Sequence, residues 1–160
     1  MSDIKQLISI IVPVFNESES IGLLLDEVIN VMSSHKFNFE LIVVNDGSKD
    51  NTQQVLKQLT FTIKELSVIS LRKNYGQTAA MSAGFDNSKG KIVITLDGDL
   101  QNDPNDIPIL ISEINNGYDL ICGWRFDRKD KLINRKIPSK IANKLIAYVT
   151  GLKLHDYGCS

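Results

Sequence analysis

The amino-acid sequence predicts an α/β fold in which a mostly parallel central sheet is covered by helices on both faces. Apolar, β-branched runs alternate along the chain with stretches whose apolar residues recur every three or four positions. Strands and helices that alternate in this way form right-handed βαβ crossovers, which bring parallel strands side by side. In addition, the first run, LISIIVPV, is apolar almost throughout, as is typical of a strand buried on both faces.

Five apolar runs are predicted to be strands, with helices between them. The predicted strands are residues 7–14, 39–44, 66–71, 91–96 and 118–122. The predicted helices are residues 21–32, 50–59, 78–85 and 107–114, the last entered from Pro104. The apolar residues at helical spacing in the first helix are Ile21, Leu24, Leu25, Val28 and Met32. Either Ser18 or Ser20 is a candidate N-cap of that helix.

Composition and charge describe a globular chain of about one domain. Of the 160 residues, 42% are hydrophobic, which excludes a mainly disordered chain. The net charge of −1 argues against a wholly nucleic-acid-binding protein, so we expect no nucleic-acid partner. No apolar run approaches the roughly 20 residues that span a bilayer, and no secretory leader is evident. The two cysteines, Cys122 and Cys159, lie far apart, so a reduced cytosolic environment is expected.

Charged and polar residues directly follow the predicted strands. In parallel α/β sheets, ligands bind at the carboxyl ends of the strands, near a change in strand order. The segments at these ends are Phe15-Asn16-Glu17, Asn45-Asp46-Gly47-Ser48, Arg72-Lys73-Asn74, Asp97-Gly98-Asp99 and Gly123-Trp124-Arg125. A structural turn alone does not require such charged groups, so we expect the functional site at this edge of the sheet.

The segment Asp97-Gly98-Asp99 places two carboxylates two positions apart at the end of the fourth predicted strand. With a glycine to allow a sharp turn, both can converge on Mg²⁺ or Mn²⁺, which favour carboxylate oxygens and keep positions open for phosphate and water. Such an ion can bridge a diphosphate and neutralise charge on a departing nucleotide. Gln101 can supply a further oxygen. Taken alone, the triplet fits an Asp-Gly turn with a solvated neighbour equally well.

Asp46 follows the second predicted strand at the same edge of the sheet. A carboxylate there can accept hydrogen bonds from a nucleobase edge or a ribose hydroxyl. The segment fits equally well a helix N-terminal turn in which Ser48 or Asp50 caps the next helix. Residues 13–17, after the first strand, are open to a similar pair of interpretations.

Five ordered motifs resemble those of the family 2 glycosyltransferases of the GT-A fold. They are IIVPVFNE (10–17), VVNDGSKDNT (43–52), RKNYGQTAAMSAG (72–84), LDGDLQNDP (96–104) and HDYGCS (155–160). Within the family, the chain is most similar to the polyprenyl-phosphate glycosyltransferases, which resemble dolichyl-phosphate mannose synthase. The resemblance covers the whole chain, and five motifs in order are far more specific than any one. It implies the GT-A fold and a nucleotide-sugar substrate.

The resemblance implies a nucleotide pocket at the ends of the first two strands. Asp46 matches the family's acid that contacts the nucleobase of the sugar nucleotide. Pro13, Phe15 and Glu17 match the first-strand edge of the same pocket. The nucleotide is expected to be UDP or GDP, and the DYGC tetrapeptide favours UDP.

The resemblance also assigns a metal site and an acceptor-side acid. Asp97 and Asp99 match the metal-binding pair, and Gln101 matches a glutamine that joins the metal site in mannose-phosphate synthases. Gly98 stands where the family usually has Ala or another small residue, and it should preserve the turn. Asp156 matches an acidic position near the transferred sugar and the acceptor. The implied cofactor is Mg²⁺ or Mn²⁺.

A strongly basic segment follows the predicted strands, in residues 125–150. Residues 125–144 hold eight Lys and Arg against two Asp, a net charge of +6. An apolar row lies beside a basic row, as in a basic amphipathic helix that is attracted to an anionic membrane surface. Arg125, Arg135 and Ser139 are candidates for holding a lipid phosphate, because a guanidinium can grip phosphate oxygens bidentately. A solvated helix face is the alternative.

The resemblance implies a metal-assisted, inverting transfer of a sugar from a UDP- or GDP-sugar to a polyprenyl phosphate, such as undecaprenyl or dolichyl phosphate, in cell-envelope glycan biosynthesis, and the residues above fit this reaction. A phosphate acceptor is already anionic near pH 7, so Asp156 can orient the sugar or acceptor without being an obligatory general base. Two alternatives stay open: a glycosyltransferase with a saccharide acceptor, and a nucleotide-sugar-binding domain without activity. The sugar and the oligomeric state are left open.

The chain is expected to be a single GT-A domain, residues 1–160, that is truncated at its C-terminus. It ends directly after the HDYGCS motif, whereas family members of this kind usually continue through further catalytic residues and often a pair of transmembrane helices. We therefore expect a protein at the cytoplasmic face of the membrane, either peripheral or anchored by helices outside this sequence.

Overall fold

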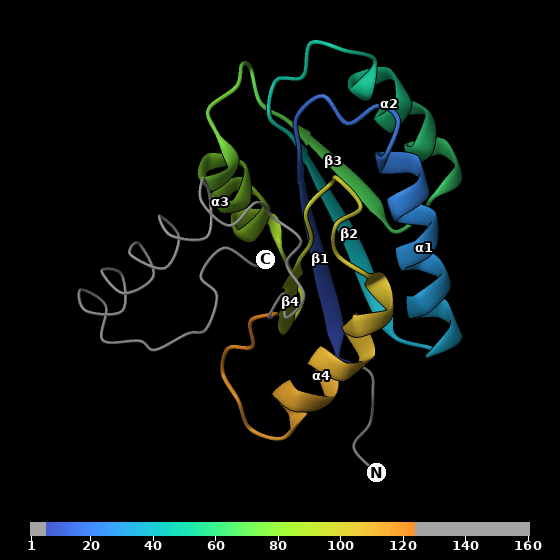
Figure 1. Cartoon of the computed structure of the whole chain (residues 1–160), viewed down its shortest axis with the longest axis vertical. Coiled ribbons are helices and arrows are strands. Elements are labelled where there is room, and N and C mark those ends of the chain that lie inside the picture. Colours follow the sequence, from blue (N-terminus) through green and yellow to red (C-terminus); the bar gives the residue numbers. More distant parts are fainter. Residues whose placement is uncertain (1–5, 124–160) are drawn as a thin grey trace, which may run out of the picture. The chain divides into compact units, whose positions relative to one another are not determined.

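The protein contains a four-stranded parallel sheet, described here from a computed structural model that covers residues 6–123. The strands are β1 (Leu7–Val14), β2 (Asn38–Asn45), β3 (Leu66–Ser70) and β4 (Ile92–Thr95). Their order is β3-β2-β1-β4, and every neighbouring pair is parallel (Figure 1). The strand order therefore reverses at β1, which is where ligands bind in sheets of this kind.

The register of the central pair brings two strand ends to the same level. β1 and β2 pair over eight residues, from Leu7 with Asn38 to Val14 with Asn45. β4 pairs with the same β1, from Ile8 with Ile92 to Ile11 with Thr95. The loops that follow β1, β2 and β4 consequently leave the sheet at one edge.

Within residues 6–123, four helices and one short 3-10 segment connect and follow the strands. They are α1 (Ile21–Ser34), α2 (Thr52–Thr62), α3 (Gln77–Asn87), η1 (Pro104–Asp106) and α4 (Ile107–Asn115). α1 and α2 cover one face of the sheet, and α3 covers the other (Figure 1). This arrangement confirms the predicted α/β class with helices on both faces.

The alternation of side chains along β1 divides the core between the two faces. Ile8, Ile10 and Val12 belong to the larger cluster, together with the apolar residues of α1 and α2. Ile11 belongs to the smaller cluster, which includes Ala80 of α3. All the apolar residues predicted for the inner face of the first helix are buried, namely Ile21, Leu24, Leu25, Val28 and Met32. Burial on both faces explains why β1 is apolar almost throughout.

The prediction of a fifth strand at Tyr118–Cys122 is wrong. These residues form no strand, and the side chains of Tyr118 and Leu120 are 62% and 66% exposed. A short apolar run becomes a strand only where a neighbour supplies hydrogen bonds and a packing surface. Among residues 6–123, no strand pairs with this segment.

Contacts divide the chain into two compact units, residues 1–112 and residues 113–160. The sheet, α1, α2 and α3 all belong to the first unit, and so does every residue of the cavity described below. Among residues 6–123, no helix is long and apolar enough to cross a membrane.

Candidate functional site

A cavity of about 310 Å³ opens at the carboxyl edge of the sheet. The end of β1, the loops that follow β1, β2, β3 and β4, and the start of α3 line it. The lining residues are Pro13, Val14, Phe15, Glu17, Asp46, Asn74, Gly76, Gln77, Ala80, Asp97, Gly98 and Asp99. The volume lies at the lower end of the range for small-molecule sites. Four of these lining residues are carboxylates, Glu17 after β1, Asp46 after β2, and Asp97 and Asp99 after β4, so the predicted edge of the sheet does hold a polar, acidic cavity.

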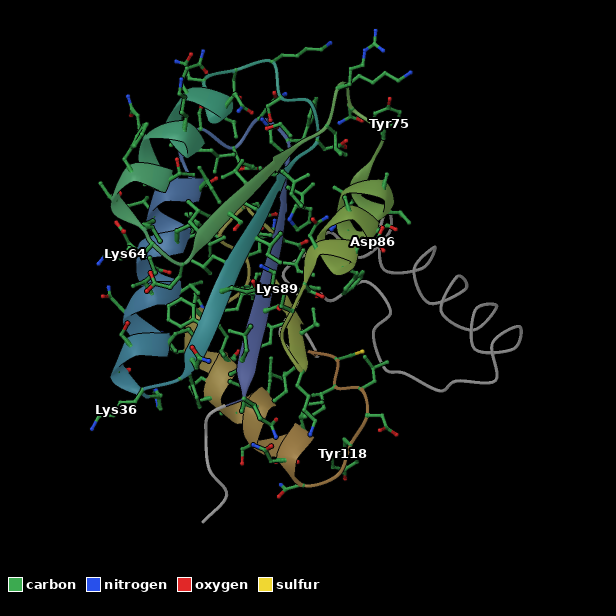
Figure 2. All side chains as sticks on the ribbon, turned by 180° about the vertical axis from the view of Figure 1, so that it is seen from behind. Lys36, Lys64, Tyr75, Asp86, Lys89 and Tyr118 are labelled. Atoms are coloured by element: carbon green, nitrogen blue, oxygen red, sulfur yellow. The ribbon has the colours of Figure 1, made fainter. Side chains whose placement is uncertain are left out.

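Asp46 is the most enclosed acid of this cavity, with only 3% of its surface exposed. Its Oδ1 accepts a hydrogen bond from the backbone N–H of Tyr75, and its Oδ2 accepts one from the N–H of Gly76, both at 2.8 Å. Figure 2 shows Tyr75 in the loop that leads into α3. The carboxylate after β2 therefore holds the loop between β3 and α3 with both of its oxygens.

The loop after β2 also makes a close backbone approach to that same loop. Gly47 has a φ of +67°, and a Cβ at this position would lie 2.4 Å from the carbonyl carbon of Lys73. A glycine is required here for two reasons, since a side chain would be both strained and in collision with backbone. This close contact fixes the loop before α3 beside Asp46.

Side chains of the loop after β2 also hold the loop that follows β1. The N–H of Asn16 donates to Oγ of Ser48 at 2.9 Å, and Oδ1 of Asn16 accepts from the N–H of Lys49 at 2.8 Å. The N–H of Glu17 donates to Oγ1 of the fully buried Thr52, at 2.9 Å. Asn16 has a φ of 59°, a conformation that Asn tolerates better than most residues. These contacts set the position of Glu17 in the cavity wall.

Asp50 completes this connection between the two loops. Its Oδ2 accepts from the N–H of Ser18 at 3.2 Å, and its Oδ1 accepts from both the N–H and the hydroxyl of Thr52. Burial opposes ionisation of Asp50, but hydrogen bonds from Thr52 and Ser18 outweigh it and lower the pKa from 3.8 to about 2. Asp50 thus lies one position before Asn51, the N-cap residue of α2, and holds both the first residue of that helix and the loop after β1. The interpretation in which Ser48 or Asp50 is the N-cap is therefore wrong in position.

Asp97 and Asp99 leave β4 on either side of the buried Gly98. Oδ1 of Asp97 accepts a hydrogen bond from Nε2 of Gln77 at 2.9 Å. Oδ1 of Asp99 accepts from the N–H of Gln101 at 3.1 Å. Between them, a Cβ on Gly98 would lie 2.8 Å from Cγ1 of Val14, so the turn is packed directly against the end of β1.

The donor set of this turn fits Mg²⁺ or Mn²⁺. Among residues 6–123, no group of three or more His, Cys, Asp and Glu is placed to hold a metal ion, so a closed protein cage of such ligands is not found there. Asp97 and Asp99 nevertheless line one cavity. Mg²⁺ is commonly bound by only one or two carboxylates, with substrate phosphates and water completing the octahedron. Two carboxylates at the wall of an open cavity match that pattern.

Comparison with known proteins identifies the family. Residues 9–160 match the family model described as glycosyl transferase family 2. The chain belongs to this family. The match covers the sheet, the cavity and the residues beyond them, so the expected family membership is confirmed.

Two curated relatives of this family 2 chain carry names that include a polyprenyl phosphate. Dodecaprenyl-phosphate galacturonate synthase from Rhizobium johnstonii is 49% identical over 157 residues, which cover 96% of this chain and 46% of that protein. Undecaprenyl-phosphate 4-deoxy-4-formamido-L-arabinose transferase from Edwardsiella ictaluri is 40% identical over 162 residues, which cover 99% of this chain and 50% of that protein. This family 2 chain therefore spans about half the length of the curated relatives it matches.

Solved structures of glycosyltransferases share the fold. The UDP complex of glucosyl-3-phosphoglycerate synthase from Mycobacterium tuberculosis is 23% identical, has a TM-score of 0.62 and covers 92% of this chain and 51% of its own. The mannosyltransferase PcManGT from Pyrobaculum calidifontis, in complex with GDP-Man and Mn²⁺, is 25% identical and has a TM-score of 0.55. The match covers 62% of this chain and 29% of that protein. The predicted GT-A fold is confirmed by such neighbours.

The structure brings most of the predicted site residues of this family 2 chain together. The cavity is lined by Pro13, Phe15, Glu17, Asp46, Asp97, Gly98 and Asp99. Gln101 is exposed and is not among the lining residues; its backbone supports Asp99. Arg125, Arg135, Ser139 and Asp156, like the basic segment, lie outside the described residues.

Besides Val14 in β1, four lining residues near α3 have no individual role predicted from the sequence, namely Asn74, Gly76, Gln77 and Ala80. They belong to the motif RKNYGQTAAMSAG, which contributes to the family resemblance. The motif was the signal, but the residues lie before and within α3, and only the tertiary structure brings them to the cavity that Asp97 also lines.

Proposed function

We propose that this chain is the nucleotide-sugar-binding part of a glycosyltransferase that moves a sugar from a UDP- or GDP-sugar to a polyprenyl phosphate, with inversion and with the assistance of Mg²⁺ or Mn²⁺. The observation that carries the proposal is the cavity itself, which is lined by Asp46, by Phe15 and by the pair Asp97 and Asp99. A nucleotide has a base at one end and a diphosphate at the other. The cavity offers chemistry for both ends.

The base end lies at Phe15, Glu17 and Asp46. Phe15 is 39% exposed, so its ring is available to a flat ligand, and aromatic faces stack on nucleobases. Asp46 already accepts two backbone hydrogen bonds, but each carboxylate oxygen has two acceptor sites. Asp46 therefore orients the wall of the base pocket and retains acceptor capacity for an N–H of the base.

The diphosphate end lies at Asp97 and Asp99, which hold the divalent ion. When bound, the ion neutralises charge that develops on the leaving nucleotide diphosphate. The role of the chain is to hold both carboxylates at the end of β4, which it does through the packed turn at Gly98 and the hydrogen bonds to Asp97 and Asp99.

The acceptor side of the proposal involves residues 124–160. Arg125, Arg135 and Ser139 hold the lipid phosphate, Asp156 orients the sugar or the acceptor, and the basic segment lies on the cytoplasmic face of the membrane. The names of the curated relatives, which include dodecaprenyl phosphate and undecaprenyl phosphate, support this acceptor class. Nucleotide complexes of structural neighbours support a nucleotide-linked donor.

The proposal is tested first by binding. In a thermal-shift assay, UDP or GDP with Mn²⁺, present at 100 times its Kd, should stabilise the chain by about 2.7 kcal/mol. This corresponds to roughly 5–10 °C for a chain of this size. Asp97→Ala should lose the Mn²⁺-dependent part of the shift, whereas Asp26→Ala, at an exposed position on α1, should keep it.

Transfer is tested second. A panel of radiolabelled UDP- and GDP-sugars is incubated with Mn²⁺ and undecaprenyl phosphate, and the label in the organic phase is measured, with a disaccharide acceptor in parallel. Label that moves only to the disaccharide would contradict the lipid acceptor. Absence of any nucleotide-dependent stabilisation, or an equal response of Asp97→Ala and the native chain, would contradict the metal-bridged nucleotide site.

A further inference from the structure

We propose that Gln77 is a positioning residue for Asp97, and that residues 74–77 fix the two acidic ends of the cavity relative to one another. The inference deepens the proposed function and rests on it, because it concerns how the same cavity is ordered for a nucleotide and its metal ion. It assigns a role to the motif at the start of α3, which the sequence reasoning left without one.

One end of the 74–77 segment is attached to the base side of the cavity. The N–H groups of Tyr75 and Gly76 both donate to the carboxylate of Asp46 at 2.8 Å. The backbone of Lys73 lies against Gly47, so closely that a Cβ there would collide with it. The segment therefore cannot shift along the sheet edge without breaking contacts to the loop after β2.

The other end of the segment reaches the metal side. Gln77 is the first residue of α3, and its Nε2 donates to Oδ1 of Asp97 at 2.9 Å. Both residues line the cavity. Within four residues, the chain thus passes from a backbone contact with one acid to a side-chain contact with the other.

The helix that carries Gln77 is itself held firmly on the sheet. Ala80, one turn along α3, is fully buried in the cluster with Ile11. A Cβ on Gly84, a further turn along, would lie 2.4 Å from Cγ2 of Ile11. Because the helix backbone contacts β1 this closely, α3 has a fixed position on the sheet, and the side-chain amide of Gln77 reaches Asp97 from that fixed helix.

A neutral amide donor suits the task. It holds one carboxylate oxygen of Asp97 and adds no charge that would compete with a cation. Partners of metal ligands that act in this way orient the ligand, and their loss typically lowers metal affinity 10- to 100-fold. Since Gln77 is exposed and Asp97 half-buried, we expect an effect at the lower end of that range.

The test compares Gln77→Met, which keeps an unbranched side chain of similar length and removes the donor, with Gln54→Met at an exposed position of α2. Mn²⁺ binding to the 160-residue chain is followed by the electron paramagnetic resonance signal of free Mn²⁺ in the presence of saturating UDP. Gln77→Met should weaken Mn²⁺ affinity about tenfold, with metal-free UDP affinity unchanged within about twofold. Gln54→Met should match the native chain in both measurements.

A double-mutant cycle separates positioning from a structural role. If Gln77 acts through Asp97, adding Gln77→Met to Asp97→Asn should weaken Mn²⁺ binding no further than Asp97→Asn alone. Gln77→Ala should reproduce the result of Gln77→Met, and both should keep the far-ultraviolet circular dichroism of the native chain.

Four outcomes would overturn the inference. Native-like Mn²⁺ affinity of Gln77→Met, or full additivity with Asp97→Asn, would refute the positioning role and leave the nucleotide site standing. An equal loss of metal-free UDP binding would show that Gln77 supports the whole cavity and not Asp97. Failure of the native chain to bind UDP at all, with or without Mn²⁺, would refute the proposed site and this inference together.

Discussion

Replacing Asp46 by Asn should destabilise the chain even when no nucleotide is present. The substitution keeps one acceptor oxygen but turns the other into an amide, which cannot accept from a backbone N–H. Either Tyr75 or Gly76 then loses its partner beside a side chain that is 3% exposed. If Asp46 served only to contact a nucleobase, the unliganded chain would be unaffected.

The magnitude follows from the two hydrogen bonds. A donor left without a partner at a buried position costs about 1–3 kcal/mol, and the remaining bond falls from the charged to the neutral class, a further loss of about 1 kcal/mol. Removing a buried charge recovers part of this, because the desolvation cost of the carboxylate disappears. We expect a net loss of about 2 kcal/mol in the free energy of unfolding, or roughly 4–8 °C in Tm for a chain of this length.

The assay is urea unfolding at pH 7 without nucleotide or metal, followed by far-ultraviolet circular dichroism. The matched control is Asp86→Asn, at an exposed position near the end of α3 that is labelled in Figure 2, which should change the free energy by less than about 0.5 kcal/mol. If Asp46→Asn were as stable as this control, the two backbone hydrogen bonds would not hold the loop, and the structural role of Asp46 would be refuted.

The other predictions concern packing and pH. Gly84→Ala should lower the free energy of unfolding by about 1–3 kcal/mol, because its Cβ would meet Ile11 at 2.4 Å. Gly22→Ala, where nothing lies within 4 Å of the new Cβ, should raise the free energy of unfolding by about 0.5 kcal/mol. If a urea titration gave the same change for both variants, the close packing of Gly84 against Ile11 would be contradicted. The pKa of Asp50 is lowered to about 2 in the folded chain, so its ionised form stabilises the fold above about pH 4, and this contribution is lost as the pH falls towards 2. Because solvent screens this partly exposed group, the contribution of its ionised form is about 1 kcal/mol. The free energy of unfolding of Asp50→Asn should therefore be about 1 kcal/mol below that of the native chain at pH 7, and this difference should disappear as the pH falls from about 4 to about 2. A difference that does not change with pH would refute the lowered pKa of Asp50.

The sheet was predictable because the hydrophobic pattern of each strand follows from which of its faces are buried. β1 is buried on both faces and reads as a continuous apolar run, and the predicted range matches the observed Leu7–Val14. The segment Tyr118–Cys122 has a similar composition, but a strand depends on its neighbour as much as on its own residues. That dependence is absent from local sequence, which is why this one prediction failed.

The location of the site was predictable by the same kind of reasoning, whereas its internal contacts were not. The carboxyl-edge rule indicated Asp46 and Asp97 without any family knowledge. It could not indicate that the carboxylate of Asp46 accepts from backbone N–H groups 29 and 30 positions away, or that the side chain of Gln77 donates to Asp97. These contacts depend on the length of α2, the register of β3 and the seating of α3 on Ile11, none of which a spacing rule contains.

The two halves of the cavity are held by different means, and this difference should separate their functions. Around Asp46 and Glu17, the loops are joined by hydrogen bonds from backbone N–H groups to the buried side chains of Asp46 and Thr52, and by a close backbone approach at Gly47. The base side is therefore ordered before any ligand arrives, and binding there costs little conformational entropy. Asp97 is instead held to α3 by a side-chain contact with the exposed Gln77, a contact that contributes little to folding. Substitutions of Asp46 should therefore cost stability and nucleotide affinity together, whereas substitutions of Gln77 should cost metal affinity at nearly constant stability.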